Sequence, residues 1–404
     1  MKLAERLSII QPSPTLAITS LAKKMQREGR DVVGFGAGEP DFDTPNHIKD
    51  AAIRALQEGK TKYAPVPGIV ELREAISQKF AKENGLHFSP EEILVSVGGK
   101  HALYNFFQAF INPGDEVIII KPYWVSYADI ALLAGAKPVY IDTKFENGFK
   151  IKPEDLESAI TSKTKLLVMN SPSNPAGVYY QKQELQELAQ VILKYPQVAI
   201  LTDDIYEKIL YDAEFCNFPM ADPSLLDRTI IINGLSKAYS MTGWRLGYTA
   251  SKIPGLIAAM SKLQGQSTSG ATTFAQYGAV AALTGDQSCV AEMVSAFRKR
   301  RDYIVQAINE IPGLKVNQPD GAFYVFPDMS EFAQNDKFQK EWKESGKASA
   351  DMYFAEKLLE QKEVALVPGS AFGVENAFRI SYATSSDQIE KGIKRIHEFV
   401  KTYL

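Results

Sequence analysis

The chain has 404 residues, of which 45% are apolar and 23% are charged, and its formal net charge at pH 7 is −3. A chain of this length can bury a large core without disulfides or structural metals, and its charge argues against binding to nucleic acids or anionic membranes. Two cysteines and four scattered histidines provide neither a disulfide framework nor a cluster of metal ligands.

The N-terminal segment, residues 1–45, opens with MKLAER and lacks the apolar core of an export signal. No apolar run elsewhere approaches the roughly 18 residues that a membrane-spanning helix requires. We therefore expect a cytoplasmic protein that acts on small molecules and has no membrane or nucleic-acid partner. One helix is predicted over Ser20–Gly29, and this segment is expected to pack with the C-terminal part of the chain.

The middle of the chain alternates short β-branched runs with helical stretches. Helices are predicted over Lys100–Phe110 and Lys182–Leu193, and strands over Ile93–Val97, Glu116–Ile120, Lys137–Ile141, Lys165–Met169, Val198–Leu201, Thr229–Asn233 and Leu246–Ala250. Strands that are separated by helices indicate parallel crossover connections in a sheet covered on both faces. We predict an α/β fold whose large domain, residues 46–285, carries a mostly parallel sheet.

The pattern changes after residue 285. One long helix is predicted over Glu292–Ile311, followed by the strands and helices Leu314–Val316, Ala322–Phe326, Met352–Gln361, Val364–Val367, Phe378–Ser381 and Ser386–Tyr403. We expect a smaller α+β domain formed by residues 1–45 and 286–404. The polar stretch Asn335–Lys347 is predicted to be a solvated surface loop.

Two features near the first strands suggest a bound anion and a planar ring. Gly98 and Gly99 precede Lys100 at the start of a predicted helix, where free backbone N–H groups can bind phosphate. The segment matches neither of the glycine-rich nucleotide-binding patterns. Trp124 follows the strand Glu116–Ile120 and could stack on a ring, although an aromatic residue there is more often part of the core.

Polar residues also follow two later strands. Asn174 lies in the turn SPSNPAG, which on its own reads as an ordinary structural turn. Asp203 and Tyr206 follow Val198–Leu201, at the sheet edge where ligands of parallel sheets bind. The acid could pair with a protonated ring nitrogen and the tyrosine could donate to a ring oxygen, but Asp203 could equally be a helix N-cap.

The segment SKAYSMTGWRLG is the most informative one, and it follows the strand Thr229–Asn233. The amine of Lys237 could form a Schiff base with an aldehyde, while Ser236 and Arg245 could bind phosphate oxygens. Read alone, however, such a lysine is more often a surface residue near a structural arginine. Further on, Arg379 lies inside an apolar strand, where burial is costly without a partner. That partner could be a substrate carboxylate or an internal salt bridge.

Taken together, these stretches resemble the fold-type I aminotransferases of class I, which use pyridoxal 5′-phosphate (PLP). The resemblance is greatest to the bacterial aspartate aminotransferases that bind the substrate side-chain carboxylate with a lysine. It covers nearly the whole chain and includes GEPDFDTP at Gly38–Pro45, YAPVPG at Tyr63–Gly68 and PYWVSY at Pro122–Tyr127.

The resemblance implies roles for individual residues. Lys237 would bind the cofactor aldehyde and move the catalytic proton, and Asp203 would pair with the ring nitrogen. The remaining cofactor contacts would come from Tyr206, Asn174, Trp124, Ser236, Arg245, Gly99, Lys100 and, from the other subunit of an obligate homodimer, Tyr63. The substrate would be bound by Arg379, Gly38, Lys100, Trp124 and Asn174.

The implied reaction is the ping-pong transfer of an amino group from L-aspartate to 2-oxoglutarate, giving oxaloacetate and L-glutamate. Alternatives are broader, aromatic or prephenate specificity, and a C–S lyase on the same fold. A regulatory protein with a degenerate domain and a dinucleotide-dependent dehydrogenase fit the motifs less well. Relatives that use prephenate tend to carry Lys before Pro-Ser-Ala-Thr, whereas this chain reads QPSPT at residues 11–15, which makes prephenate less expected.

Overall fold

The computed structural model describes residues 3–10 and 14–404. Gln11, Pro12 and Ser13, which carry part of the comparison with prephenate-using relatives, lie outside the described residues. Within the described ranges, no helix is both long enough and apolar enough to cross a membrane.

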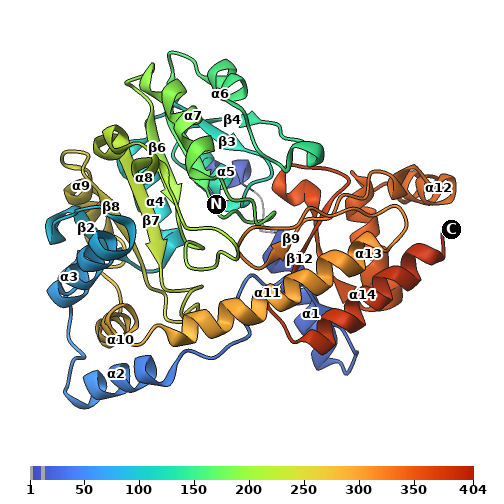
Figure 1. Cartoon of the computed structure of the whole chain (residues 1–404), viewed down its shortest axis with the longest axis horizontal. Helices are drawn as coiled ribbons and strands as arrows, with labels where there is room; N and C mark the ends of the chain where they lie inside the picture. The colour runs from blue at the N-terminus through green and yellow to red at the C-terminus, as the bar shows by residue number, and fades with distance from the viewer. Residues whose placement is uncertain (1–2, 11–13) are drawn as a thin grey trace.

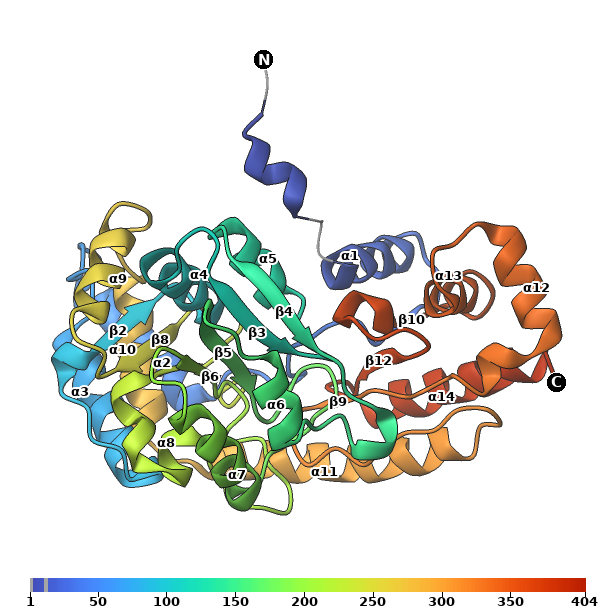
Figure 2. The ribbon, with the colours of Figure 1, turned by 90° about the horizontal axis from the view of Figure 1, so that it is seen from above.

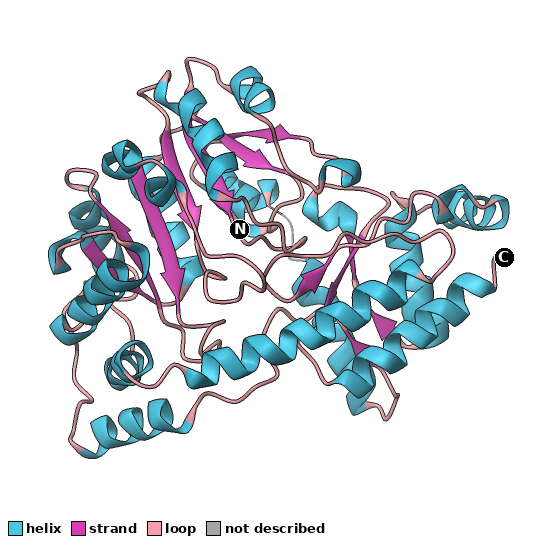
Figure 3. Cartoon of the chain, viewed as in Figure 1, coloured by secondary structure: helices cyan, strands magenta, loops and turns pink. Residues whose placement is uncertain are grey.

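A seven-stranded sheet forms the centre of the larger half of the molecule (Figures 1 and 3). Its strands, in spatial order, are β2 (Ile93–Ser96), β8 (Gly247–Ser251), β7 (Thr229–Gly234), β6 (Ala199–Asp203), β5 (Thr164–Asn170), β3 (Glu116–Ile120) and β4 (Lys137–Ile141). All neighbouring pairs from β4 to β7 are parallel, and β8 alone runs antiparallel to both of its neighbours. The predicted α/β fold with a mostly parallel sheet is confirmed.

Helices cover both faces of this sheet, as its buried central strands require. In β3, Val117 and Ile119 pack into the core formed with α4 (Gly99–Phe110), α5 (Ser126–Leu133) and α9 (Leu256–Gly265). Ile118 faces the opposite core, which includes residues of α6 (Pro153–Ala159), α7 (Lys182–Leu193) and α8 (Phe218–Ala221). A third core joins β2 and β8 to α3 (Val70–Lys79) and α10 (Thr273–Thr284), with α2 (Asn46–Gln57) packed beside α10.

The smaller half contains two short sheets. One has the order β11 (Val367–Pro368), β12 (Phe378–Ser381) and β9 (Tyr324–Val325), with antiparallel pairing throughout. The other pairs β1 (Val33–Gly34) with β10 (Val364–Ala365), so the N-terminal strand lies within the C-terminal part. The domain boundaries at residues 45/46 and 285/286 stay predictions.

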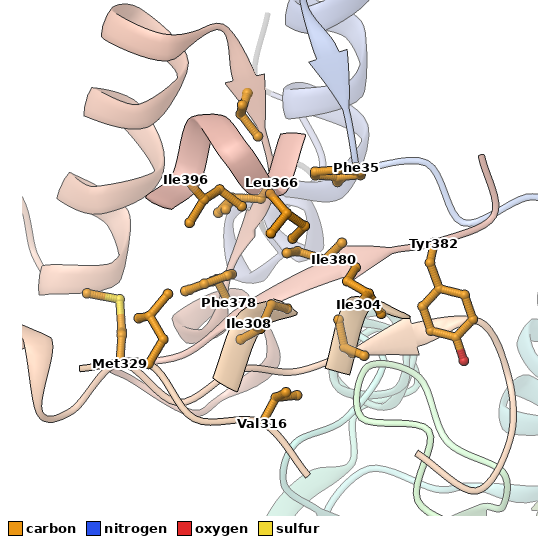
Figure 4. Close-up of a cluster of buried hydrophobic side chains, with 14 of the residues drawn as sticks. Phe35, Ile304, Ile308, Val316, Met329, Leu366, Phe378, Ile380, Tyr382 and Ile396 are labelled. Atoms are coloured by element: carbon orange, nitrogen blue, oxygen red, sulfur yellow. The ribbon is translucent and has the colours of Figure 1, made fainter. Parts of the chain in front are cut away.

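Helices pack around these short sheets and complete a separate apolar core. They are α1 (Pro14–Arg27), α11 (Ser288–Asn309), α13 (Ala350–Lys362) and α14 (Ser386–Lys401). Phe35, Ile304 and Ile308 approach Phe378 and Ile380 of β12 in this core (Figure 4). Helix α11 is long enough to run beside both halves (Figure 2).

The prediction of a surface loop at Asn335–Lys347 is wrong, because the segment forms α12 (Asp336–Ser345). The Asn335 side chain accepts a hydrogen bond from the Phe338 N–H at 3.1 Å and thereby caps the helix. Phe338 is fully buried and Trp342 packs against the same core. Their spacing of four residues, which is visible in the sequence, places both on one helix face and could have revealed the helix.

A second correction concerns the strands after α11. Leu314–Val316 does not form the predicted strand, and only Lys315 makes an isolated bridge, to Asp328. The predicted strand Val364–Val367 is divided into β10 and β11, which belong to different sheets. An apolar run of three or four residues can be buried as irregular chain just as well as in a strand. Whether it pairs into a sheet therefore depends on the strands that lie beside it in the fold.

Candidate active site

A cavity of about 360 Å³ lies at the carboxyl ends of β5, β6 and β7, where these strands face β9 and β12. This edge of a parallel sheet is where ligands characteristically bind. Every predicted site residue except Tyr63 lines the cavity: Gly38, Gly99, Lys100, Trp124, Asn174, Asp203, Tyr206, Ser236, Lys237, Arg245 and Arg379. The fold therefore brings together motifs that are scattered from the first to the last part of the chain.

Lys237 follows β7 and points its amine at the segment before α2. Its Nζ donates a hydrogen bond of 2.5 Å to the carbonyl oxygen of Gly38. Burial lowers the pKa of the Lys237 amine to about 8, with Arg379 and Arg245 acting in the same direction and Glu39 against it. More of this amine is therefore neutral, and thus nucleophilic, near neutral pH than in an ordinary lysine.

Asp203 lies at the end of β6, beside Asn170 of β5 in the sheet register. The Tyr127 hydroxyl donates to Oδ2 of Asp203 at 2.6 Å, and the side-chain amide of Asn170 donates to the Asp203 carbonyl oxygen at 2.8 Å. Burial raises the pKa of the Asp203 carboxyl to about 6, while the Tyr127 hydrogen bond opposes this shift. A cationic group facing the carboxyl would therefore stabilise its charged form. No described helix begins here, so the alternative of a helix N-cap is wrong.

Arg379 is 1% exposed and approaches the cavity from β12. Its Nη1 donates to Oδ1 of Asn174 at 2.9 Å, and its Nη2 donates to the carbonyl oxygen of Gly36 at 2.7 Å. Its Nε has no partner, and no acidic side chain of the described residues pairs with it. The internal salt bridge is therefore not formed, and a buried cation remains available for an anionic ligand.

The start of α4 and the segment after β7 form a cradle for an anion. A Cβ atom on Gly98 would lie 2.5 Å from Nη2 of Arg245, and one on Gly247 would lie 2.3 Å from the backbone nitrogen of Gly99. Only glycine allows these approaches, which place the Arg245 guanidinium beside the first N–H groups of the helix. With Ser236 nearby in the cavity wall, these donors fit a phosphate.

Lys100 and Trp124 form another part of the cavity wall. The Nζ of Lys100 lies 4.8 Å from the centre of the Trp124 ring, and the Tyr127 ring packs edge to face against Trp124 with the two ring centres 5.4 Å apart. Burial lowers the pKa of the Lys100 amine, and the charge of Arg245 adds to the effect. A negative group entering the cavity here would find both an aromatic surface and a cation.

Tyr63 does not reach this cavity. Its side chain is 98% exposed, and it lines a surface hollow together with Thr273 and other residues between 268 and 273. The hydroxyl of Thr273 donates to the carbonyl oxygen of Lys62 at 2.7 Å, which holds the loop against α10. The predicted contact of Tyr63 with the other subunit stays a prediction.

Sequence reasoning missed several residues of the cavity wall, namely Leu103, Tyr127, Asn170, Ile205, Thr242 and Tyr324. The position of Tyr127 could have been predicted from the sequence, because it lies three residues after the predicted site residue Trp124. The structure places it in the first turn of α5. Asn170 could have been predicted too, since it is a polar residue at the end of a buried strand. Tyr324 lies within a predicted strand, but nothing local to it indicates a site.

Comparison with known proteins gives one consistent result. The family model for aminotransferase class I and II matches residues 30–396. An aspartate/prephenate aminotransferase of Nitrosomonas europaea is 50% identical over 98% of this chain and 99% of its own length, and an aspartate aminotransferase of Bacillus subtilis is 48% identical over 100% of both. A solved aspartate aminotransferase of Rhizobium meliloti is similar with a TM-score of 0.93 at 43% identity, over 99% of each chain. The chain therefore belongs to the class I and II aminotransferases, whose members are PLP-dependent enzymes.

Proposed function

We propose that this enzyme transfers the amino group of L-aspartate to 2-oxoglutarate, giving oxaloacetate and L-glutamate. The observation that carries the proposal is the presence of two cations, Arg379 and Lys100, in the same cavity as the Lys237 amine. A dicarboxylic substrate has one carboxylate for each cation and presents its Cα between them. The aspartate names of the relatives support the same substrate class.

The residues present fit PLP at each of its polar groups. The cradle of Ser236, Arg245 and the α4 amides would hold the phosphate, and Asp203 would face the ring nitrogen. Tyr206 and Asn174 would contact the ring oxygen, and Trp124 would lie against the ring face. When bound, PLP supplies a ring that delocalises negative charge at the substrate Cα.

The protein's own part in the reaction is orientation and proton transfer. Arg379 and Lys100 would hold the two carboxylates, so that the Cα–H bond has one orientation relative to Lys237. The Lys237 amine would accept the Cα proton of the substrate and would deliver it to C4′ of the cofactor. Its lowered pKa makes the neutral base available near pH 8.

The pKa of Lys237 leads to a prediction about cofactor capture. The fraction of the Lys237 amine that is neutral increases as the pH rises through about 8 and approaches its maximum above that value. We therefore expect the rate of covalent PLP capture by cofactor-free protein, followed by stopped-flow absorbance, to level off between about pH 8 and 9. Nα-acetyl-lysine amide, measured in parallel, corrects for ionisation of PLP itself. A rate that still rises tenfold per pH unit above pH 9 would contradict the lowered pKa.

The substrate is tested by an assay that varies both the amino donor and residue 100. Without 2-oxoglutarate, aspartate should convert the cofactor absorption band of the wild type to that of the aminated form and yield oxaloacetate, and added 2-oxoglutarate should then restore the original band. Lys100→Met should raise KM for aspartate by about 10- to 100-fold, as expected for the loss of one charged hydrogen bond. It should leave KM for alanine nearly unchanged, since alanine has no second carboxylate.

Other outcomes of this assay decide between the alternatives. If Lys100→Met raised KM for aspartate and for alanine by the same factor, Lys100 would not recognise the side-chain carboxylate of the substrate. A preference for aromatic donors or prephenate would replace the aspartate proposal with broader specificity. Release of ammonia and pyruvate from a sulfur-containing amino acid, without oxaloacetate formation from aspartate, would favour the lyase.

We also propose a homodimer in which Tyr63 of the partner subunit completes the phosphate site. The support is an exposed aromatic side chain on a loop that Thr273 and Gln264 hold by hydrogen bonds to its backbone. Mixing Lys237→Ala chains with Tyr63→Ala chains should create heterodimers with one fully wild-type site. Activity above that of either parent supports shared sites, and the absence of any gain in verified heterodimers contradicts them.

The division into domains is a further part of the proposal. Residues 46–285 would form the large domain, and residues 1–45 and 286–404 would form the small one. This division is supported by the cavity itself, since Arg379 and Tyr324 enter it from the short sheet while Asp203 and Lys237 come from the large one. A cytoplasmic location stays a prediction from the sequence.

A further inference from the structure

Three of the proposed site residues surround a single tyrosine of β9. Tyr324 is fully buried, and its hydroxyl lies 2.8 Å from the hydroxyl of Tyr206. The centre of its ring is 4.7 Å from the guanidinium carbon of Arg379. A Cβ atom on Gly38 would lie 2.8 Å from the Tyr324 hydroxyl, so glycine at position 38 makes room for it.

The sheet places Tyr324 and Arg379 on one face. Tyr324 is paired with Ser381 across the antiparallel ladder of β9 and β12, and Arg379 is two residues before Ser381 in the same strand. Residues opposite each other and two apart share a face, so the ring and the guanidinium are diagonal neighbours. Phe372 lies 5.1 Å from the guanidinium and adds a second aromatic ring to the support.

The hydroxyl pair raises a question of proton direction. Each phenol has one proton, and either oxygen can be the donor at this distance. If Tyr206 donated to Tyr324, it would have no proton left for a ring oxygen in the cavity. If Tyr324 donates instead, Tyr206 accepts that bond and keeps its own proton for the ligand.

We propose that Tyr324 is a positioning residue, which donates to Tyr206 so that the Tyr206 proton is directed at the cofactor, and which supports the Arg379 guanidinium with its ring. This inference rests on the proposed contact of Tyr206 with the cofactor. It makes one side chain responsible for two alignments: that of the cofactor oxygen and that of the substrate carboxylate. The hydroxyl and the ring carry these roles separately, so two substitutions can distinguish them.

Tyr324→Phe removes only the hydroxyl. A hydrogen bond to the ionised ring oxygen favours the ionised form, so weakening it should raise the pH at which the visible band of lysine-bound cofactor titrates. We expect an upward shift of about half to one pH unit, with KM for the substrates nearly unchanged. Tyr324→Leu also removes the ring and should additionally raise KM for amino-acid and oxo-acid substrates about tenfold.

The matched control is Tyr382→Phe. Tyr382 is also fully buried, and its hydroxyl lies 2.9 Å from that of Tyr211, outside the cavity. This variant also loses one hydroxyl of a buried tyrosine pair, so it should lower the thermal stability of the protein about as much as Tyr324→Phe does. It should leave the spectroscopic titration and both KM values at their wild-type positions.

Tyr206→Phe separates failure of this inference from failure of the site assignment. If Tyr206→Phe shifts the titration and the double variant with Tyr324→Phe shifts it no further, both hydroxyls act through one contact, as proposed. If Tyr206→Phe shifts the titration and Tyr324→Phe matches Tyr382→Phe, the inference is overturned while the assignment of Tyr206 stands. If Tyr206→Phe shifts nothing, the assignment and the inference are both overturned.

Discussion

Lys237→Ala is expected to reduce transamination by about 10⁴-fold or more while the protein still binds PLP. The substitution removes both the amine that captures the cofactor and the base that moves the Cα proton. The phosphate cradle, Asp203 and Trp124 are untouched, so noncovalent binding should persist. Steady-state kinetics with aspartate and 2-oxoglutarate measures the loss, and absorption spectra after desalting show whether PLP is retained.

The exposed Lys262 of α9 supplies a control for this experiment. Lys262→Ala removes an amine of the same kind that does not line the cavity, and it should retain wild-type rates and the wild-type cofactor band. A Lys237→Ala enzyme with a near-normal rate would end the assignment of Lys237. Partial rescue of Lys237→Ala by added small amines would support the role of Lys237 as a base, because it replaces the proton acceptor without restoring the side chain.

Replacing Arg379 should weaken the binding of both substrates of the ping-pong cycle. Truncating one partner of a buried, hydrogen-bonded charge pair costs roughly 2–5 kcal/mol, which corresponds to about 30- to 4,000-fold in affinity. Arg379→Ala should therefore raise KM for aspartate and for 2-oxoglutarate alike, since both present an α-carboxylate. The KM values of Arg379→Lys should fall between those of Arg379→Ala and wild type, because lysine keeps the charge but cannot bind a carboxylate in a bidentate manner.

Arg395→Ala on α14 is the corresponding control. Arg395 also donates from Nη2 at 2.7 Å, but to Asp31 and outside the cavity, so this variant should keep both KM values. The proposed role of Arg379 predicts that the substrate-binding free energy lost in Arg379→Ala, measured as the rise in KM, greatly exceeds any loss in its free energy of unfolding. Equal KM values for Arg379→Ala and wild type, in a folded protein, would contradict the carboxylate site.

Much of the larger half could be predicted from the sequence because its strands are buried on both faces. Such strands are short, apolar and rich in β-branched residues, and the buried strand Glu116–Ile120 has the predicted bounds. The edge strand Lys137–Ile141 also has the predicted bounds, although it is only partly buried. The smaller half was harder, since its strands span only two to four residues. The amphipathic α12 was predicted to be a loop because most of its residues are polar, and only Phe338 and Trp342 indicate that one face of it is buried.

The residues of the site divide in the same way. Asp203, Lys237 and Asn174 each follow a recognisable strand, and the carboxyl ends of parallel strands share one edge of the sheet. Arg379 could be suspected because a charge in an apolar strand is costly, but its partner could not be chosen. In the fold, its contact with Asn174 joins residues that are 205 positions apart in the chain.

The sequence by itself determined the order of elements, the family and most of the polar residues around the cavity. Only the tertiary structure decided that Tyr127 bonds to Asp203, that Arg379 has no acidic partner among the described residues, and that Tyr324 lies between Tyr206 and Arg379. Periodicity reports which face of an element is buried, whereas the partner of a buried hydroxyl or cation depends on packing between distant elements.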